Sequence, residues 1–573
     1  MNYKEIHQRW MDSSMVDTAT KNELIGLTSE KEIEDRFYKN LEFGTGGLRG
    51  KIAAGMNRMN VYTVAKSTKG LAKYLVTTDK NPSICIAYDS RNMSDVFAQT
   101  AAKVLTATGV KVYLYEGLRP TPMLSFAVRH IGTSAGIVIT ASHNPKEYNG
   151  YKVYGSDGGQ ITDHAAAEIL GLINETDVFE DIHFMELAEA AEKGLLVYIG
   201  EEVDKAYYEK VAGLVIRKNL VKERASELKI IYTPIHGSGN IPVRTMLSNL
   251  GFTNVQIVKE QELPDGNFPT APYPNPENPQ VFNIAIEMAK ESSPDLIFGT
   301  DPDCDRIGVI VKEDSGEYKV LSGNQVGVLL SDYMLNARKE EGILDKKDII
   351  IKTIVTTEMA RAITKSYGVQ LIDVLTGFKY IGEKIEEFEK TGSNNFILGF
   401  EESYGYLAGG FVRDKDAVIA AVLISEMALY YKTRGKNLSQ ALDDLFKEHG
   451  YYKEHLISIE MEGKDGQEKI KSIITGLRDN SPICVGDTKI RIIEDYQLSQ
   501  RYNKDENSIE FIDLPKSNVI KFILEDNSWF VVRPSGTEPK IKIYASVVGK
   551  TKTDAEEKLE VFIKDINLLL NVQ

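Results

Sequence analysis

The sequence predicts a multidomain α/β protein with an α+β carboxyl-terminal part, and three observations support this fold class. At 573 residues the chain is longer than one hydrophobic core normally supports, so we expect three to five domains. Short apolar strands alternate with helical stretches through most of the chain, as in repeated βα units. From about His455 onward, several strands mix with two helical stretches, a pattern typical of an α+β domain.

Composition argues against several classes of partner. The chain has a net charge of −15 and an isoelectric point near 5.3, which argues against nucleic acid or an anionic membrane as the main partner. No apolar stretch approaches the length of a bilayer span, and the amino terminus lacks the apolar core of a signal peptide. Cys85, Cys304 and Cys484 match no zinc or CxxC spacing, so we expect reduced thiols and a cytoplasmic location.

The loop Thr140-Ala141-Ser142-His143-Asn144-Pro145 is the first candidate for chemistry. The apolar run 135–139 predicts a buried strand, so Ser142 would stand at that strand's carboxyl end, where open α/β sheets bind their ligands. A hydroxyl there, followed by a titratable residue and a proline that fixes the turn, indicates a nucleophile or the carrier of a covalent phosphoryl group. The alternative is an ordinary polar surface loop.

The elements before this loop predict the beginning of an α/β domain. The first forty residues favour helices of a surface arm. The stretch 43–50 contains four glycines together with Arg49, which fits either a ligand-binding loop or a structural turn. We expect strands at 83–87 and 111–115, with Ser94 as the N-cap of the helix between them.

Two lysines are candidates for proton transfer. Lys152 lies ten residues beyond Ser142. An exposed lysine is usually only a solvated charge, but this one is close in sequence to the candidate nucleophile. Lys379 follows a short predicted strand and is a second candidate acid or base.

A cluster of carboxylates follows the next series of elements. A new βα unit is expected to begin at 229–232, beyond a boundary near residue 205, and the strand 295–298 leads into Asp301, Asp303 and Asp305. Carboxylates at alternate positions point the same way in an extended chain, and the intervening proline disfavours a helix.

These three carboxylates predict a binding site for one hard cation. A calcium EF-hand loop is excluded, because the position that requires glycine is Arg306 and the position that requires glutamate is Lys312. Three carboxylate oxygens that leave further positions for a phosphate oxygen suit Mg²⁺. The alternative is a structural acidic turn.

A third region carries a candidate sugar-binding loop. Helices are expected at 323–335 and 417–431, with a strand at 348–355. Between these helices, Glu401 and Ser403 lie on a loop at the end of a strand, where they could bind the hydroxyl groups of a neutral sugar. A solvated acidic turn is the alternative.

The α+β part contains a candidate anion-binding loop. Strands are expected at 456–461, 519–524, 529–533 and 540–547, and helices at 469–477 and 553–570. Between the last two strands, Arg533-Pro534-Ser535-Gly536-Thr537 offers a guanidinium, two hydroxyls and exposed backbone. Such a loop suits a phosphate dianion, although a polar hairpin turn is the alternative.

These four motifs occur in the order seen in the α-D-phosphohexomutases, and the chain resembles that family from about residue 40 to its end. The chain length, the glycine-rich opening at 43–50 and the Glu-Glu-Ser-Tyr-Gly loop resemble the phosphoglucomutase and phosphopentomutase branch. The resemblance implies three mixed α/β domains and a TATA-binding-protein-like carboxyl-terminal domain around a central cleft. The domains would cover residues 1–205, 206–320, 321–453 and 454–573.

The resemblance also implies roles for the candidate residues. Ser142 would be the phosphoserine, and Mg²⁺ would bind Asp301, Asp303, Asp305 and the Ser142 oxygen. Catalysis or proton transfer would further involve Arg49, His143, Lys152 and Lys379. The substrate-binding residues would be Thr45, Arg306, Glu401, Ser403, Lys415, Arg533, Ser535, Gly536 and Thr537.

The implied reaction is the reversible conversion of α-D-glucose 1-phosphate and glucose 6-phosphate through a glucose 1,6-bisphosphate intermediate, which would also act as activator. Phosphopentomutase or phosphomannomutase activity on the same scaffold, a serine phosphatase and a non-catalytic carbohydrate-binding protein are the alternatives. The expected partner is a small phosphosugar, with no nucleic acid and no membrane, in a monomer or dimer.

Overall fold

The structure is a computed structural model that describes residues 2–44, 46–313, 315–461, 463–534 and 540–570. The chain divides into two compact units. The first contains Met1–Val326 and Ile381–Asn437, and the second contains Gly327–Tyr380 and Leu438–Gln573. Among the helices described, none has the length and apolar character needed to cross a membrane.

The first unit begins with three helices that pack against the residues that follow them, which include Ala54 and Tyr62. These are α1 (Tyr3–Asp12), α2 (Thr18–Ile25) and α3 (Glu30–Phe37). Trp10, Leu24 and Phe37 are buried in one apolar cluster. The predicted helices are therefore confirmed, but they are packed elements rather than a loose surface arm.

A six-stranded sheet in the order β1-β5-β4-β2-β3-β6 forms the body of this region. Its strands are β1 (Gly47–Lys51), β2 (Ser83–Tyr88), β3 (Lys111–Tyr115), β4 (Ala135–Ile139), β5 (Tyr148–Gly155) and β6 (Leu196–Ile199). β2, β3, β4 and β6 are parallel, β5 pairs antiparallel with β4, and β1 pairs antiparallel with β5. The associated helices are α4 (Val61–Thr78), α5 (Ser94–Ala107), α6 (Thr121–Ile131), α7 (Asp163–Asn174) and α8 (Leu187–Glu192).

Local predictions in this sheet are partly corrected. The strand predicted at 135–139 is β4, but the strand β5 that follows the serine loop was missed because alternate glycines and tyrosines obscure its apolar pattern. The glycine-rich stretch 43–50 contributes to strand β1 rather than forming only a loop. Ser94 is the first residue of α5 and not its N-cap, which is Met93 with φ +68°.

A five-stranded sheet in the order β11-β10-β9-β7-β8 follows in the same unit. Its strands are β7 (Ile230–Thr233), β8 (Val255–Ile257), β9 (Leu296–Thr300), β10 (Ile307–Lys312) and β11 (Tyr318–Val320). The helices of this region are α9 (Glu201–Ala212), α10 (Lys218–Arg224), α11 (Asn240–Asn249) and α12 (Asn283–Ser292). The unit is completed by the hairpin β14 (Asn395–Glu401) and β15 (Gly405–Leu407) and by the buried helix α16 (Ala417–Lys432).

Two helices carry the chain between the units. α13 (Gly323–Glu340) continues from the first into the second, and α15 (Phe378–Thr391) returns. The second unit begins with the parallel pair β12 (Asp348–Thr353) and β13 (Gln370–Val374), accompanied by α14 (Met359–Tyr367) and α17 (Leu438–His449).

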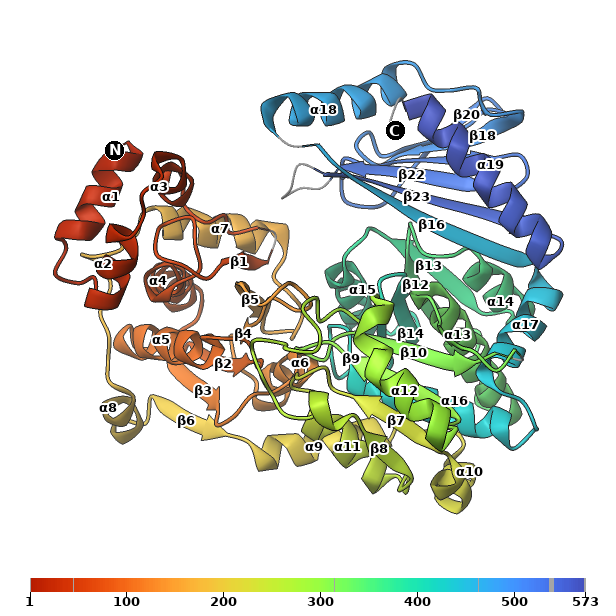
Figure 1. Cartoon of the computed structure of the whole chain (residues 1–573), viewed down its shortest axis with the longest axis horizontal. Helices are drawn as coiled ribbons and strands as arrows, with labels where there is room; N and C mark the ends of the chain where they lie inside the picture. The colour runs from red at the N-terminus through yellow and green to blue at the C-terminus, as the bar shows by residue number, and fades with distance from the viewer. Residues whose placement is uncertain (1, 45, 314, 462, 535–539, 571–573) are drawn as a thin grey trace. The chain divides into compact units, whose positions relative to one another are not determined.

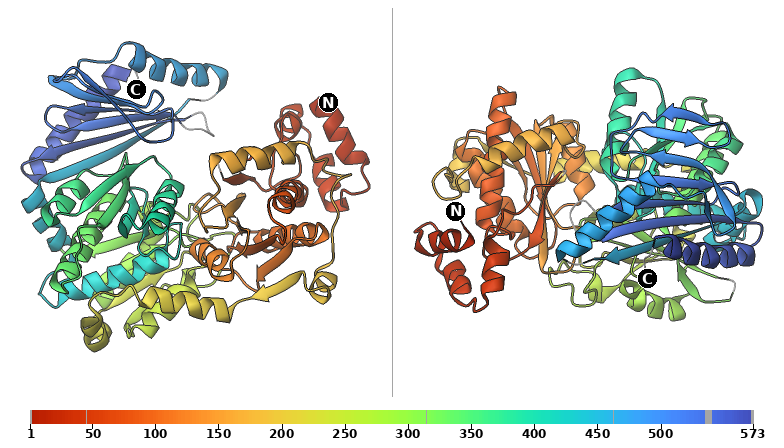
Figure 2. Two further views of the ribbon diagram at one scale, coloured as in Figure 1. Left: turned by 180° about the vertical axis from the view of Figure 1, so that it is seen from behind. Right: turned by 90° about the horizontal axis from the view of Figure 1, so that it is seen from above.

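An antiparallel sheet forms the rest of the second unit, in the order β16-β23-β22-β21-β18-β19-β20, with β17 paired to β18. Its strands are β16 (Tyr451–Glu460), β17 (Cys484–Val485), β18 (Thr488–Asp495), β19 (Gln500–Asn503), β20 (Ser508–Phe511), β21 (Ile520–Leu524), β22 (Trp529–Pro534) and β23 (Lys540–Gly549). The helices α18 (Gly463–Asp479) and α19 (Lys552–Leu570) cover the same face, as Figure 2 shows, and their apolar residues share one core with the strands. The predicted α+β pattern is confirmed.

Replacing Phe97 with alanine is expected to destabilise the protein by about 3–5 kcal/mol, because the side chain is fully buried beneath the first sheet and its loss leaves a cavity. Val96, its neighbour on α5, is 37% exposed. The matched Val96→Ala change should therefore lower the free energy of unfolding by less than about 1 kcal/mol. Chemical denaturation of both variants measures the difference, and equal losses would contradict this packing.

Candidate active site

Ser142 lies on a tight turn after β4. Thr140 organises the turn, since its Oγ1 donates a hydrogen bond to Asp89 Oδ2 (2.6 Å) and accepts one from the Ser142 amide (2.8 Å). Ser142 has φ +53°, a left-handed conformation that is uncommon for a residue other than glycine. The residue is only 3% exposed, so its hydroxyl faces a largely enclosed environment.

Arg91 holds the serine loop from the end of the neighbouring strand β2. Its guanidinium donates hydrogen bonds to four backbone carbonyls, those of Ser142 (2.5 Å), Asn144 (2.5 Å), Pro145 (3.0 Å) and Tyr148 (3.1 Å). It also forms an ion pair with Asp89 (3.4 Å). Arg91 therefore positions the loop in addition to neutralising a buried carboxylate.

The three aspartates converge in a turn that follows β9. The prediction of an extended chain at these residues is wrong. They form a turn, in which Cys304 has φ +53°. Asp301 Oδ1 closes this turn by accepting hydrogen bonds from the amides of Asp305 and Arg306, both at 3.0 Å. One oxygen from each of Asp301, Asp303 and Asp305 lies within 4.8 Å of the others.

This turn meets the serine loop directly. Ser142 Oγ donates a hydrogen bond of 2.9 Å to Asp301 Oδ2. The residues on either side of that bond are 159 positions apart in the chain. The candidate nucleophile and the candidate metal ligands thus share one buried site.

The donor set fits a divalent cation. Among the described residues, Asp303 Oδ1 and Asp305 Oδ1 are buried and lack a hydrogen-bond partner. Burial, followed by repulsion from these two neighbours, raises the pKa of Asp301 well above its usual range. Buried carboxylates that are close together and incompletely paired require a compensating positive charge, and hard oxygen ligands favour Mg²⁺ or a similar ion.

Two lysines provide part of that charge. Lys152 Nζ lies 2.8 Å from Asp303 Oδ2 and 3.5 Å from Asp305 Oδ2, while Lys415 Nζ lies 3.2 Å from Asp305 Oδ2. Burial opposes ionisation of Asp305, but the ammonium groups of Lys415 and Lys152 outweigh it and lower its pKa. Lys152 is fixed by the sheet, since it lies on β5 opposite Val138 of β4.

His143 and Arg49 stand on the other side of the serine. His143 Nδ1 lies 3.0 Å from Ser142 Oγ. Burial, with the nearby guanidinium groups of Arg306 and Arg49, lowers the pKa of His143 well below its usual range, so the imidazole is neutral in this environment. Arg49, on β1, donates a hydrogen bond to Asn144 Oδ1 (3.0 Å) in the same loop.

The candidate sugar-binding loop also meets the aspartate turn. The Ile307 amide donates to the Tyr404 carbonyl (3.1 Å), and Arg306 forms a β-bridge with Gly405. Glu401 is 5% exposed at the end of β14, and Ser403 lies half-buried in the following turn. Burial opposes the charge of Lys415, but the carboxylates of Asp305, Asp414 and Glu401 raise its pKa. Glu401 and Lys415 therefore interact electrostatically in the same site.

The remaining candidates fall into two groups. Thr45, Ser535, Gly536 and Thr537 lie outside the described residues. Lys379 and Arg533 belong to the second unit, where Lys379 Nζ lies 4.9 Å from the centre of the Tyr380 ring and Arg533 pairs with Lys542 between β22 and β23.

Sequence reasoning missed several residues that complete the site. Thr121 Oγ1 donates to Asp303 Oδ2 (2.8 Å), and Glu277 forms an ion pair with Arg306 (2.6 Å). The loop-holding role of Arg91 was missed as well. Arg91 did carry a signal, because it follows the strand beside β4, and adjacent parallel strands end at the same edge of a sheet. Glu277 carried none, because it lies in a loop rich in proline and asparagine.

We expect Arg91→Lys to lower kcat by about 100-fold, since lysine cannot reach the same four carbonyls and the serine would shift from its position. Steady-state kinetics together with circular dichroism measure this effect in folded protein. Arg224→Lys, at an exposed ion pair on α10, is the matched control and should leave kcat unchanged. A folded Arg91→Lys enzyme with ordinary kcat would exclude the positioning role.

Fold and site together define an enzyme class: a multidomain α/β phosphotransfer enzyme with a loop serine beside a buried acidic turn that is compatible with a metal ion. Comparison with family models places the chain more narrowly. The phosphoglucomutase/phosphomannomutase α/β/α domains I, II and III match residues 40–179, 205–316 and 322–449, and the carboxyl-terminal domain of that family matches 493–563. The chain belongs to the phosphoglucomutase/phosphomannomutase family of α-D-phosphohexomutases.

Curated relatives support the same assignment over nearly the whole chain. Phosphoglucomutase from Staphylococcus haemolyticus is 38% identical over 515 residues, which are 90% of this chain and 91% of the relative. Phosphoglucomutase from Staphylococcus aureus is 38% identical over 538 residues, covering 93% and 95% of the two chains. Membership of the family makes the chain an isomerase that transfers a phosphoryl group.

Solved structures share the fold. A putative phosphomannomutase from Thermus thermophilus superposes with a TM-score of 0.69 at 21% identity, covering 93% of this chain and 99% of the other. The open form of a phosphoglucomutase from Paramecium gives a TM-score of 0.68 at 17% identity, covering 92% and 95%. The predicted four-domain fold, with a β-rich carboxyl-terminal domain, is confirmed.

Proposed function

We propose that this protein is a phosphoglucomutase that interconverts α-D-glucose 1-phosphate and glucose 6-phosphate through a phosphoserine at Ser142. The observation that carries the proposal is the 2.9 Å hydrogen bond between Ser142 Oγ and Asp301 within a buried triad of carboxylates. Two relatives that are 38% identical to this chain, and that align with it over more than nine-tenths of their own length, are named phosphoglucomutase.

The reaction consists of two phosphoryl transfers. Phosphorylated Ser142 donates its phosphoryl group to the C6 hydroxyl of glucose 1-phosphate, so the Oγ–P bond breaks as a sugar O–P bond forms. The hydroxyl proton leaves to a base, and the product is glucose 1,6-bisphosphate. After the bisphosphate reorients, Ser142 Oγ attacks its other phosphorus, and the released sugar oxygen takes up a proton. Overall, no phosphate is lost to water.

The chain supplies several groups suited to these steps. Enclosure of Ser142, which is 3% exposed, protects its phosphoryl group from hydrolysis. His143 would accept or return the serine proton, and its Nδ1 at 3.0 Å from Ser142 Oγ supports this role. Lys152 and Arg49 supply positive charge around the loop, and Lys379 remains a further predicted proton-transfer residue.

Asp301, Asp303 and Asp305 would hold Mg²⁺, with the Ser142 oxygen as a further ligand. When bound, Mg²⁺ stabilises negative charge on a phosphoryl group in transfer. The two carboxylate oxygens without hydrogen-bond partners among the described residues support this assignment. Glucose 1,6-bisphosphate would serve as the intermediate and activator, because it delivers a phosphoryl group to unphosphorylated Ser142.

Substrate binding is assigned to two sets of residues. Glu401 and Ser403, with Arg306 and Lys415 beside them, would bind the sugar hydroxyls and neighbouring phosphate oxygens. The predicted binding residues for the phosphate that does not react are Arg533, Ser535, Gly536 and Thr537, with Thr45 as a further substrate contact.

Glu401→Gln is expected to raise KM for glucose 1-phosphate by about 10-fold or more, because a hydrogen bond from a sugar hydroxyl to a carboxylate is worth about 1.5–3 kcal/mol. Glu402→Gln changes the adjacent carboxylate, for which no sugar contact is proposed, and should have a smaller effect. Initial-rate kinetics on both variants measure KM and kcat. Equal KM values in Glu401→Gln and the wild type would remove Glu401 from the sugar site.

Substrate preference is tested by comparing initial rates on glucose, mannose and ribose 1-phosphates with Mg²⁺ and catalytic bisphosphate. The proposal requires glucose 1-phosphate to be converted fastest to its 6-phosphate. Faster turnover of mannose or ribose 1-phosphate would instead indicate a phosphomannomutase or phosphopentomutase. Release of inorganic phosphate faster than formation of glucose 6-phosphate would indicate a phosphatase. The predicted cytoplasmic location and the choice between monomer and dimer remain predictions.

A further inference from the structure

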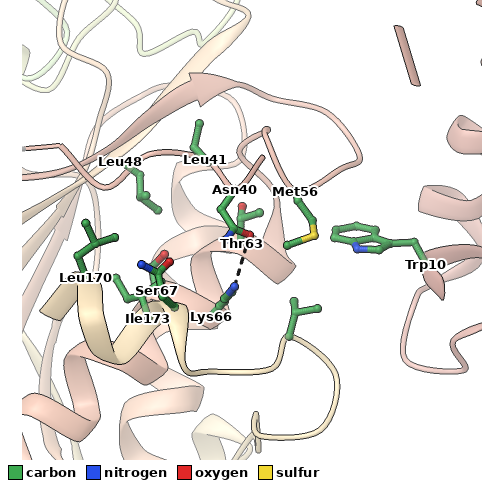
Figure 3. A pocket seen from close by; sticks show the side chains of 12 residues that line it. Trp10, Asn40, Leu41, Leu48, Met56, Thr63, Lys66, Ser67, Leu170 and Ile173 are labelled. Atoms are coloured by element: carbon green, nitrogen blue, oxygen red, sulfur yellow. Dashed lines mark hydrogen bonds between the residues drawn. The ribbon is translucent and has the colours of Figure 1, made fainter. Parts of the chain in front are cut away.

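A cavity separate from the site around Ser142 lies in the first unit, where the amino-terminal helices meet α4 and the end of α7. A narrow part of about 20 Å³ (Figure 3) and a wider part of about 310 Å³ share lining residues that include Trp10, Met56 and Lys66. The wider part is also lined by Ile6 and Phe179. None of the lining residues belongs to the site around Ser142.

The cavity contains a buried ammonium group with incomplete compensation. Lys66 is 9% exposed, and its Nζ makes a hydrogen bond of 3.4 Å to Asn40 Oδ1, which is the dashed line in Figure 3. That distance is at the long limit for a hydrogen bond. Within the part of the chain that the structure describes, Lys66 forms no ion pair. Burial lowers its pKa, which reflects the cost of an ammonium without a close counter-ion.

A second polar group in the same cavity lacks a partner. Trp10 is 1% exposed, and its Nε1 is buried without a hydrogen bond to any described residue. Buried indole N–H groups usually find an acceptor. Trp10 and Lys66 thus line the same space, which is partly open to solvent and has polar as well as apolar lining residues.

The other charged groups lining the cavity compensate the ammonium only in part, because Asp177 attracts Lys66 but is itself paired with Arg9. Arg9 and Asp177 neutralise each other through two hydrogen bonds of 2.7 and 2.8 Å, and the bonds from Arg9 lower the pKa of Asp177 to about 2. Glu175 also lines the wider part, but it makes no ion pair with Lys66 among the described residues. An anion entering the cavity would meet an unpaired cation at Lys66.

The apolar part of the lining indicates the chemistry of the rest of the ligand. Trp10 packs edge-on against Phe179 with ring centres 5.7 Å apart, and Ile6 and Met56 belong to the same cluster. A volume of about 310 Å³ lies at the lower end of the range for small-molecule sites and accommodates about ten water-sized groups. A short aromatic or aliphatic body could pack against the apolar residues of this part, which include Trp10, Met56 and Phe179.

We propose that this cavity is a binding site for a small amphipathic carboxylate, whose carboxylate pairs with Lys66 and whose apolar body packs against Trp10, Met56 and Phe179. Part of the wall comes from α1, which precedes residue 40, where the match to the family's first domain begins. The site is thus built partly by a segment outside that match.

Fluorescence of Trp10 tests the proposal. The chain has two tryptophans, so the full-length Trp529→Phe protein reports on Trp10 alone. The probes are 3-phenylpropionate and 3-phenyl-1-propanol, which share a skeleton and differ in charge. We expect a saturable change in Trp10 emission and a Kd for the acid at least about 10-fold lower than for the alcohol, as one charge-assisted hydrogen bond implies.

Variants in the Trp529→Phe background locate the contact. Lys66→Met should abolish the preference for the acid, and Glu175→Gln should strengthen binding of the acid by removing a negative charge from the wall. Lys69→Met is the matched control on α4, because Lys69 Nζ contacts Thr108 and does not line the cavity, and it should leave both Kd values unchanged.

Two results would overturn the proposal. One is equal Kd values for the acid and the alcohol, or no saturable change with either, in the protein that retains Lys66; this comparison does not depend on whether Lys66→Met folds. The other is an unchanged preference for the acid in folded Lys66→Met.

Discussion

Ser142→Ala should lower mutase turnover by at least about 10⁴-fold, because the group that carries the phosphoryl group between the two transfers would be absent. The side chain is small, and its loss removes one hydrogen bond to Asp301 and one contact with His143. The fold should therefore be preserved. Turnover of glucose 1-phosphate in the presence of bisphosphate measures the effect, and phosphopeptide mass spectrometry should find phosphate on Ser142 in the active enzyme.

The matched control for this variant is Ser156→Ala. Ser156 is exposed in the turn that follows β5, in the same sheet, and its removal should leave turnover unchanged. Near-normal activity of Ser142→Ala, or a phosphoryl group that maps to a different residue, would remove Ser142 from the reaction pathway.

Removal of the metal is expected to have an effect of similar size. Without a cation, Asp301, Asp303 and Asp305 lie close together with two oxygens lacking partners among the described residues. The ammonium groups of Lys152 and Lys415 already pair with these carboxylates, so the charge of a transferring phosphoryl group would be less well offset. Chelation with EDTA should lower turnover by at least about 10³-fold, since metal ions contribute several kcal/mol to such transfers. Added Mg²⁺ should restore the activity.

Asp303→Asn tests the same site by mutation. We expect half-maximal activity to require at least about 100-fold more Mg²⁺, as loss of a charged ligand should weaken binding at least as much as loss of a supporting contact. Asp505→Asn, in an exposed turn of the second unit, is the control and should leave the Mg²⁺ requirement unchanged. Activity of the wild-type enzyme that survives EDTA would contradict the metal site.

Apolar runs predicted the buried strands well. The strands β3 and β4 lie within the predicted bounds, and α16 follows the predicted apolar helix closely. In β4 and α16, burial of nearly every residue leaves an almost uninterrupted apolar run. Strands such as β1 and β5 were missed, since they are rich in glycine and polar residues. β5 pairs with β4 and β1 pairs with β5, so the strand conformation of both depends on tertiary pairing.

The main site residues could be predicted from the sequence because they follow strands that apolar runs identify. Ser142, Asp301, Asp303 and Asp305 carry reactive or ligating side chains on short turns after apolar strands, and that context marks them as more than surface loops. Arg91, Thr121 and Glu277 carried weaker signals, because their importance comes from what they contact and not from a local pattern.

The sequence by itself determined the α/β class, the family and the identity of the acidic and hydroxyl groups, since strand periodicity and motif spacing are local properties of the chain. Only the tertiary structure decided that Ser142 hydrogen-bonds to Asp301, that Lys152 and Lys415 flank the same carboxylates, and that Lys66 lies buried beside Trp10. These contacts join residues far apart in the chain. They form because strand order and packing fix where each loop ends, which no local pattern specifies.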